Sequence, residues 1–207
     1  MSELPTTLDE AVNLFEDSVS LPKGFFNDLP SQDDWSFIIK IHALLETLVT
    51  QAICSAVGKT ELQGILGKLA FANSSTGKMA FARELGLLDS TQLNYLVVLT
   101  KIRNAYVHDI SSIGYSLNTV IDNLNESERL NICKAATPIW EDDDKKAYLL
   151  FLRTLPKRIL WMCALGVISN TMIEKEKRII QNQMLKNIKE TIAAISENVI
   201  KEIVNRK

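Results

Sequence analysis

The residues best suited to chemistry lie together at positions 103–108, which read Arg-Asn-Ala-Tyr-Val-His. A histidine can accept or donate a proton near neutral pH. An arginine can stabilise negative charge that develops on phosphoryl oxygens, and an asparagine can orient either group or a substrate. Arg103, Asn104 and His108 therefore suit cleavage of RNA by attack of a 2'-hydroxyl on its neighbouring phosphate, a route that needs no metal.

The spacing of these residues leaves a second interpretation open. Asn104 and His108 are four residues apart and share a helix face. Arg103 and His108 are five apart, about 140° around an ideal helix, so the arginine must swing toward the imidazole. In the alternative, Arg103 makes an ion pair and His108 ends the helix, where a cation is favourable.

Two expected helices would position this segment. One begins at the Asp89-Ser90 cap and carries the segment at its end. The other follows the Asp33-Asp34 cap, ends at Gly58 and carries Glu46. If the two helices pack together, Glu46 is a fourth candidate that would tune His108. His42, on the same helix as Glu46, is interpreted as a partly buried helix residue.

The wider stretch from Leu69 to Asp109 carries three recognisable pieces in order. These are Phe81-Ala82-Arg83, Leu85-Gly86-Leu87-Leu88, and Arg103-Asn104 with His108. The last piece resembles the Arg-x4-His signature of the HEPN superfamily, and residues 35–125 resemble the mannitol-repressor (MltR) family. The resemblance implies a helical domain, a role for Arg103 and His108 as a pair, and a homodimer with that pair in a cleft between protomers.

Composition predicts an all-α protein. The chain has 207 residues, of which 46% are hydrophobic, and only 8 glycines and 5 prolines. Good helix-forming residues dominate most segments, and no segment alternates as a strand would. We expect a single-domain helical bundle, divided into an N-terminal helix and loop (1–32), a HEPN/MltR-like core (33–170) and a long amphipathic C-terminal helix (171–207).

The other expected elements follow from local caps and breakers. Thr7 caps a first helix, residues 18–32 form a loop, and residues 110–125 are ambiguous. Further helices are expected from Thr60 to Leu69, from Met79 to Leu88 and from Ser127 to Ala136, the last stopped by Pro138. Residues 141–144 (Glu-Asp-Asp-Asp) open another helix, which Pro156 should break or kink.

The expected C-terminal helix carries a continuous apolar stripe at spacings of seven, four and three. Its members are Ile173, Ile180, Met184, Ile188, Ile192, Ile195 and Val199. Such a stripe either packs in the protein's own core or forms a seam for a partner helix. Packing in its own domain is the preferred interpretation.

Charge and cysteine content narrow the function classes. The formal net charge of -2 offers no basic field to a nucleic acid. Cys54, Cys133 and Cys163 form no pair or cluster and are read as core residues of a reducing compartment. The acidic N-terminus lacks a signal peptide, and the apolar run 159–168 is too short to span a membrane. We expect a cytoplasmic protein that does not associate with a membrane and binds neither a cofactor nor a metal.

Two functional hypotheses follow. The first is a HEPN-like, metal-independent endoribonuclease in defence or stress control, with His108 as general acid and base, Arg103 as phosphate stabiliser and Asn104 as orienter. The second is a non-catalytic, MltR-like transcriptional regulator or protein-interaction module whose C-terminal helix binds a protein partner. Exposure of Arg103 and His108 in an open cleft would favour the first.

Overall fold

The computed structural model describes residues 7–73, 75–108, 114–136 and 144–205. Within those ranges every regular element is a helix, which confirms the all-α prediction. The α-helices are α1 (Leu8–Ser18), α2 (Phe25–Asp28), α3 (Asp34–Val57), α4 (Gln63–Leu66), α5 (Lys78–Glu84), α6 (Ser90–Val107), α7 (Leu117–Asp122), α8 (Glu126–Ala136), α9 (Lys145–Thr154) and α10 (Pro156–Asn205), with 3-10 turns η1 (Leu29–Ser31) and η2 (Thr60–Leu62).

The predicted caps set the ends of the main helices. Thr7 forms a capping box with Glu10 at the start of α1, and the Asp33 side chain accepts from the Ser36 backbone N–H at the start of α3. Gly58 closes α3 with a positive φ of 66°, a conformation that glycine adopts without strain. The positions of these helix ends depend only on neighbouring residues, because each cap bonds a backbone group within a few residues.

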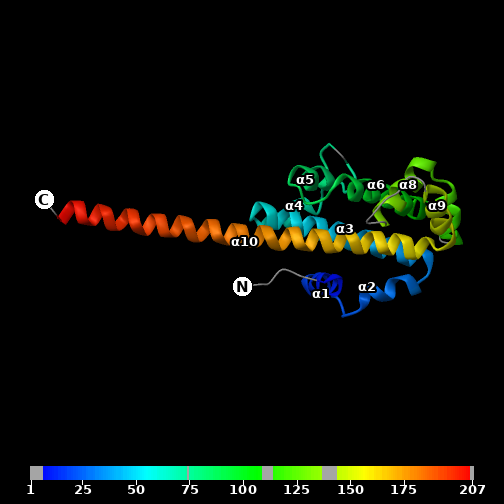
Figure 1. Ribbon diagram of the computed structural model, residues 1–207, viewed down its shortest axis with the longest axis horizontal. Helices are drawn as coiled ribbons and strands as arrows, with labels where there is room; N and C mark the ends of the chain where they lie inside the picture. Colours follow the sequence, from blue (N-terminus) through cyan, green and yellow to red (C-terminus); the bar gives the residue numbers. More distant parts are fainter. Residues whose placement is uncertain (1–6, 74, 109–113, 137–143, 206–207) are drawn as a thin grey trace.

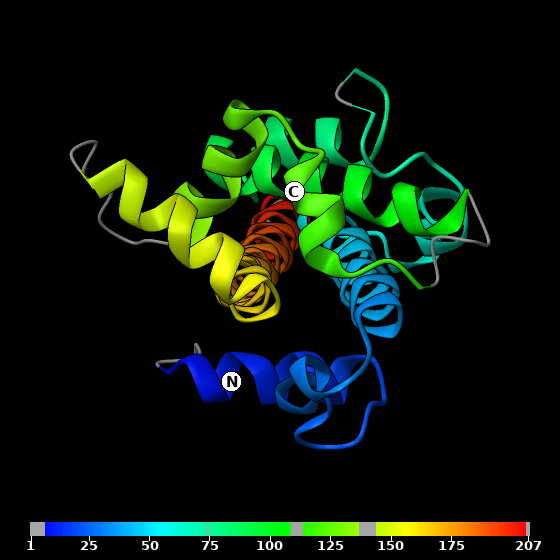
Figure 2. The same cartoon turned by 90° about the vertical axis from the view of Figure 1, so that its right-hand side faces the viewer.

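The helices form three layers (Figure 2). α1 and α2 form one outer layer, α3 and the first half of α10 lie side by side in the middle, and the segments from α5 to α9 cover the other side. α3 lies at the centre of the core and buries, among others, Phe37, Ile41, Leu45, Leu48 and Ala52. Burying these side chains on one long helix supplies much of the hydrophobic stabilisation of the fold.

α3 is also the one described helix that is long and apolar enough to cross a membrane. In the fold, 61% of its apolar 18-residue window is buried inside the protein, as in the central helix of a helical core. The sequence prediction had considered only the run 159–168, which lies in α10.

α10 begins earlier than predicted and extends far beyond the other helices (Figure 1). The predicted break at Pro156 is confirmed, since α10 begins at this residue. Proline is favourable at the first position of a helix, where its missing N–H would have no partner within the helix. A start at residue 171 was wrong: the helix runs without interruption from Pro156, so the expected boundary between residues 170 and 171 lies inside it.

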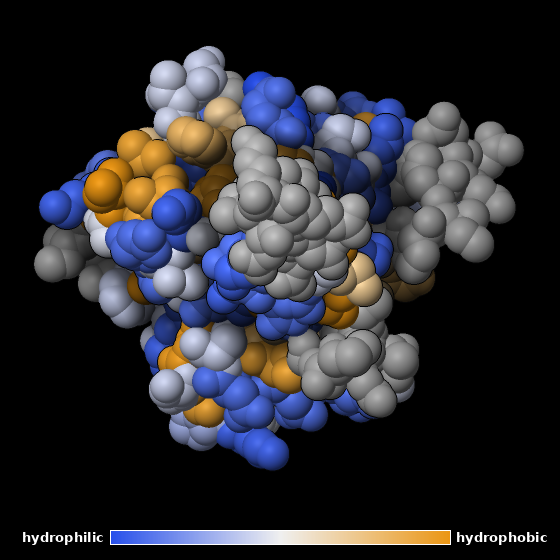
Figure 3. Space-filling view, turned by 90° about the vertical axis from the view of Figure 1, so that its left-hand side faces the viewer, coloured by the Kyte–Doolittle hydropathy of each residue, from blue (hydrophilic) through white to orange (hydrophobic). Residues whose placement is uncertain are grey.

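The two halves of α10 differ in burial. We call residues 156–182 the proximal segment and residues 183–205 the distal segment; the body is the proximal segment together with α1 to α9. The proximal segment buries Leu160, Ala164 and Ile168. The two stripe members that lie in it, Ile173 and Ile180, are half-buried, so the preferred interpretation, packing in the protein's own core, holds only in part for them. It is wrong for residues 183–197, all of which are exposed. Viewed along α10 from its C-terminal end, the described surface is mostly hydrophilic with separate apolar patches (Figure 3).

Several shorter elements also differ from the sequence prediction. The expected loop at 18–32 contains α2 and η1, because Glu16 accepts backbone N–H groups from Gly24 and Phe26 and holds the chain in a tight turn. The expected helix from Thr60 to Leu69 is only the short η2–α4 pair, and the helix at 79–88 ends at Glu84. Residues 117–122 form α7. Pro138 and residues 141–143 lie outside the described ranges.

Candidate functional site

The predicted segment lies in the last turn of α6. Asp89 begins this helix through a capping box with Gln92, and α6 continues to Val107, so Arg103 and Asn104 are helical and His108 is the C-cap. The His108 backbone N–H donates to the Asn104 carbonyl oxygen at 3.1 Å. Arg103 and Asn104 are half-buried, whereas His108 is exposed.

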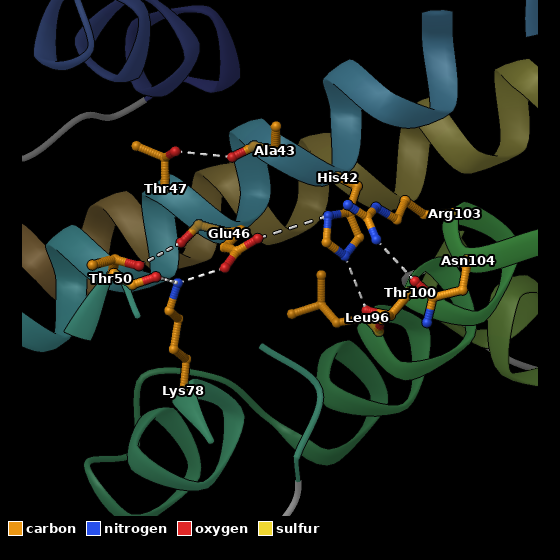
Figure 4. A network of polar contacts seen from close by, with 11 residues as sticks. His42, Ala43, Glu46, Thr47, Thr50, Lys78, Leu96, Thr100, Arg103 and Asn104 are labelled. Carbon is orange, nitrogen blue, oxygen red and sulfur yellow. Dashed lines mark hydrogen bonds and ion pairs between the residues drawn. The ribbon is translucent and has the colours of Figure 1, made fainter. Parts of the chain in front are cut away.

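Arg103 contacts its neighbour and faces α3 (Figure 4). Its guanidinium Nη1 donates to Asn104 Oδ1 at 3.1 Å, so Asn104 orients the arginine. The arginine charge is near enough to His42 to lower the pKa of that imidazole. No hydrogen bond or ion pair joins Arg103 to His108 within the described part of the chain. The imidazole that Arg103 approaches is therefore the one on α3.

His42 lies between α3 and α6, 6% exposed. Its Nε2 is 3.2 Å from Thr100 Oγ1, and the Thr100 hydroxyl donates its proton to the Leu96 carbonyl oxygen at 2.8 Å. Because a hydroxyl has one proton to donate, His42 Nε2 carries a hydrogen and donates it to Thr100. The other ring nitrogen, Nδ1, is then unprotonated and lies 3.9 Å from Glu46 Oε2.

Burial sets the charge state of His42. The pKa of His42 is lowered from 6.5 to about 4, mainly by removal from water; the charge of Glu46 raises it, and those of Arg103 and Lys78 lower it. The Phe71 ring packs edge-on against the imidazole at a centroid distance of 5.2 Å. His42 is therefore neutral at pH 7, and its ring is held in one orientation by Thr100 and Phe71.

Glu46 pairs with a nearly buried lysine. Lys78 Nζ lies 2.5 Å from Glu46 Oε1 and 3.3 Å from the Gly67 carbonyl oxygen, and its side chain is only 2% exposed. The Glu46 side chain is 32% exposed and reaches an open cavity of about 350 Å³. The cavity is lined by Ala43, Glu46, Thr47, Thr50, Gln63, Gly67 and Lys78.

The loop before α5 carries Lys78 to this position. The Lys78 backbone N–H donates to the Ala70 carbonyl oxygen at 3.0 Å, which closes the loop. A Cβ atom at Gly77 would collide with the carbonyl oxygens of Ala70 and Asn73, so only glycine fits there. The sequence analysis did not identify Lys78 as a site residue. One signal was present: Lys78 is the first residue of a helix, where the helix dipole disfavours a cation, so a carboxylate partner was to be expected.

These residues form one polar network between α3, α5 and α6. It contains Glu46, Arg103 and Asn104 of the predicted set, and His42, Lys78 and Thr100 in addition. His108 makes no described side-chain contact with it, and the described side-chain contacts of Glu46 are with Lys78 and His42. The contacts of Lys78 with Glu46 and of Thr100 with His42 join α3 to α5 and to α6, which favours a role in holding the helices together. Among the described residues, no group of three or more His, Cys, Asp or Glu side chains is placed to hold a metal ion.

Comparison of the chain with protein-family models, with curated proteins and with solved structures finds no match in any of the three.

Proposed function

We propose that the protein is a non-catalytic interaction module, in which the distal segment of α10 binds an amphipathic helix of a protein partner. One observation carries the proposal. Every residue from 183 to 197 is exposed, and five of these residues are large apolar side chains, each more than half exposed. The five are Met184, Leu185, Ile188, Ile192 and Ile195.

A helix with this composition gains little from remaining alone in water. Isolated helices are marginal even when they are rich in alanine, and most helical stability in proteins comes from packing of an amphipathic face. Isoleucine and threonine are weaker helix formers than alanine. A contiguous apolar face on a protruding element is typical of an interaction surface. The distal segment therefore has the properties of one half of a helical interface.

The body holds this surface in a fixed direction. The Tyr95 hydroxyl donates to the Leu160 carbonyl oxygen at 2.9 Å within the core. Further along the helix, Arg178 donates to the Leu85 carbonyl oxygen and Asn182 to that of Ser55, each at 3.0 Å. These bonds fasten the proximal segment to α3, to α6 and to the α5–α6 connection. The distal segment thus extends from a rigid base.

Site-specific crosslinking tests this function in the cells that make the protein. A photoreactive benzophenone amino acid replaces Ile192, on the apolar face, or Glu190, on the opposite face. We expect a discrete crosslinked protein band from position 192 and none from position 190. Equal crosslinking from both positions, or none from either, would contradict a specific helical interface.

A second candidate function is metal-independent RNA cleavage, favoured by the exposure of His108 at the same helix end as the Arg103–Asn104 pair. In this hypothesis His108 transfers protons, Arg103 stabilises the phosphate, Asn104 orients Arg103, and Glu46 acts through the network. The homodimer that the family resemblance implies would supply a cleft. Cleavage of RNA in EDTA to cyclic-phosphate ends, lost in Arg103→Ala and His108→Ala, would support it; a folded protein without cleavage would count against it.

Both candidate functions are assigned to the cytoplasm. Cys54, Cys133 and Cys163 are buried and form no disulfide, as in proteins of reducing compartments.

A further inference from the structure

The apolar side chains of the distal segment lie on one line along α10. Leu185, Ile188, Ile192 and Ile195 follow one another at spacings of three, four and three residues, with exposed fractions of 54–58%. Alternating steps of three and four place side chains along the seam of a left-handed coiled coil, at the two core positions of its seven-residue repeat. Met184 lies at the edge of this line. We call these five residues the seam.

The seam begins where contacts with the body end. Asn182 makes the last hydrogen bond that α10 gives to another described element. One seven-residue repeat before Leu185 and Ile188 stand Arg178, which bonds to the body, and Gln181, which is exposed. The two core positions of the seam are therefore occupied by polar residues one repeat earlier, where α10 still contacts the body. The seam therefore serves something other than this chain's own core.

Four described charges of the distal segment form ion pairs with one another. Lys186 and Glu190 form an ion pair at 3.9 Å, and Lys201 and Glu197 form one at 3.5 Å. Lys186 is two residues before Ile188, about 200° around the helix, so the first pair lies on the opposite face. Lys189 is the one charged side chain that flanks the seam among residues 184–197. The seam thus presents no array of like charges to an identical surface.

We infer that the seam is occupied by a second copy of this chain, so that the distal segments of two or more molecules form a coiled coil. This inference rests on the proposed interaction function and names its partner. An uncharged line of leucine and isoleucine packs against itself without electrostatic conflict, whereas a selective hetero-partner is normally specified by charges beside the seam. In a parallel pairing, Lys189 would lie beside Met184 of the partner, so that neither copy places two lysines together.

Isoleucine at both core positions also has a consequence for the number of strands. Isoleucine at both core positions a and d, or leucine at a with isoleucine at d, favours three- and four-stranded coiled coils over two-stranded ones. The seam reads Leu185, Ile188, Ile192, Ile195, which fits that preference. The assembly would carry its bodies at the ends of a shared helical rod, with the polar network of each body outside the contact.

Sedimentation equilibrium of the full-length chain at micromolar concentrations tests the inference. The wild type is expected to sediment at a multiple of 23.2 kDa. Ile188→Ser/Ile192→Ser should return it to a single 23.2 kDa species. The matched control is Lys186→Ser/Glu190→Ser, which has the same residue spacing and the same new side chain on the opposite face, and should remain assembled. A monomeric wild type, or a seam variant as assembled as the wild type, overturns the inference.

Disulfide trapping gives an answer that does not depend on the folding of a disruptive variant. The three native cysteines are buried in the body, so a cysteine placed at residue 192 is an exposed thiol on the seam. Oxidation of Ile192→Cys should yield a covalent dimer, and oxidation of Glu190→Cys should not. Absence of the Ile192→Cys dimer overturns self-pairing. If position 192 nevertheless crosslinks to a different protein in cells, the interaction function stands and only the identity of the partner is wrong.

Discussion

The two halves of α10 carry similar residues and have opposite surroundings. The proximal segment buries Leu160, Ala164 and Ile168 against α3 and its neighbours, whereas Ile188 and Ile192 of the distal segment are exposed. Both halves repeat apolar residues with a helical period. Periodicity shows that a helix has an apolar face to bury, but it does not say whether the burying surface comes from the same chain.

The two histidines show the same contrast on a smaller scale. His42 is enclosed by Thr100, Phe71 and Glu46, and burial lowers its pKa to about 4. His108 ends α6 in an exposed position. An imidazole can serve proton transfer or packing, and the environment separates the two uses. The enclosed histidine contributes to the stability of the body, and the exposed one remains accessible to a ligand.

The largest expected effect is the difference in stability loss between isoleucine-to-alanine substitutions in the two halves of α10. Ile168→Ala should lower the free energy of unfolding by about 3 to 4 kcal/mol, because it opens a cavity at a fully buried position. Ile192→Ala should change it by less than about 0.5 kcal/mol, because the body does not contact that side chain. Urea unfolding followed by tryptophan fluorescence, to which Trp161 in the body contributes, measures both.

The comparison needs sub-micromolar protein, since self-association would couple unfolding to concentration. Equal losses for the two variants would mean that the distal segment folds against the body, and the division of α10 into two environments would be wrong.

The pH dependence of stability should show the burial of His42. Its folded-state pKa of about 4 lies below 6.5, so the unfolded chain binds more protons between these values. Stability is then lost as the pH falls from 6.5 toward 4, by about 2 to 3 kcal/mol from this group. His42→Gln, compared with the wild type by urea unfolding at pH 7.5 and pH 4.5, should remove that part of the loss. An unchanged pH dependence would mean that the imidazole is hydrated.

The smallest expected effect concerns the exposed histidine. His108→Ala should shift the Tm by less than about 2 °C, because an exposed C-cap side chain contributes little packing. Thermal unfolding of the variant beside the wild type measures the shift. A drop of several degrees would assign His108 a structural role at the end of α6 and weaken the ribonuclease candidate.

Much of the local structure could be predicted because its causes are local. Thr7, Asp33 and Asp89 bond backbone groups within three residues, and Gly58 reverses the chain at its own position. The bond between Arg103 and Asn104 is also local, and orientation of Arg103 was one of the alternatives that the sequence left open for Asn104. The contacts of Glu46 were not evident from the sequence, because its partner Lys78 is 32 residues away and on another helix.

The sequence by itself determined that the chain is helical, where its capped helices begin, and that α10 has an apolar face, because caps and periodicity depend on neighbouring residues. Tertiary structure alone decided that His42, 58 residues from Thr100, is the imidazole beside Arg103. It also decided where the body ends along α10. Contacts between distant segments depend on how whole helices pack, and the apolar period of α10 continues past the last of those contacts.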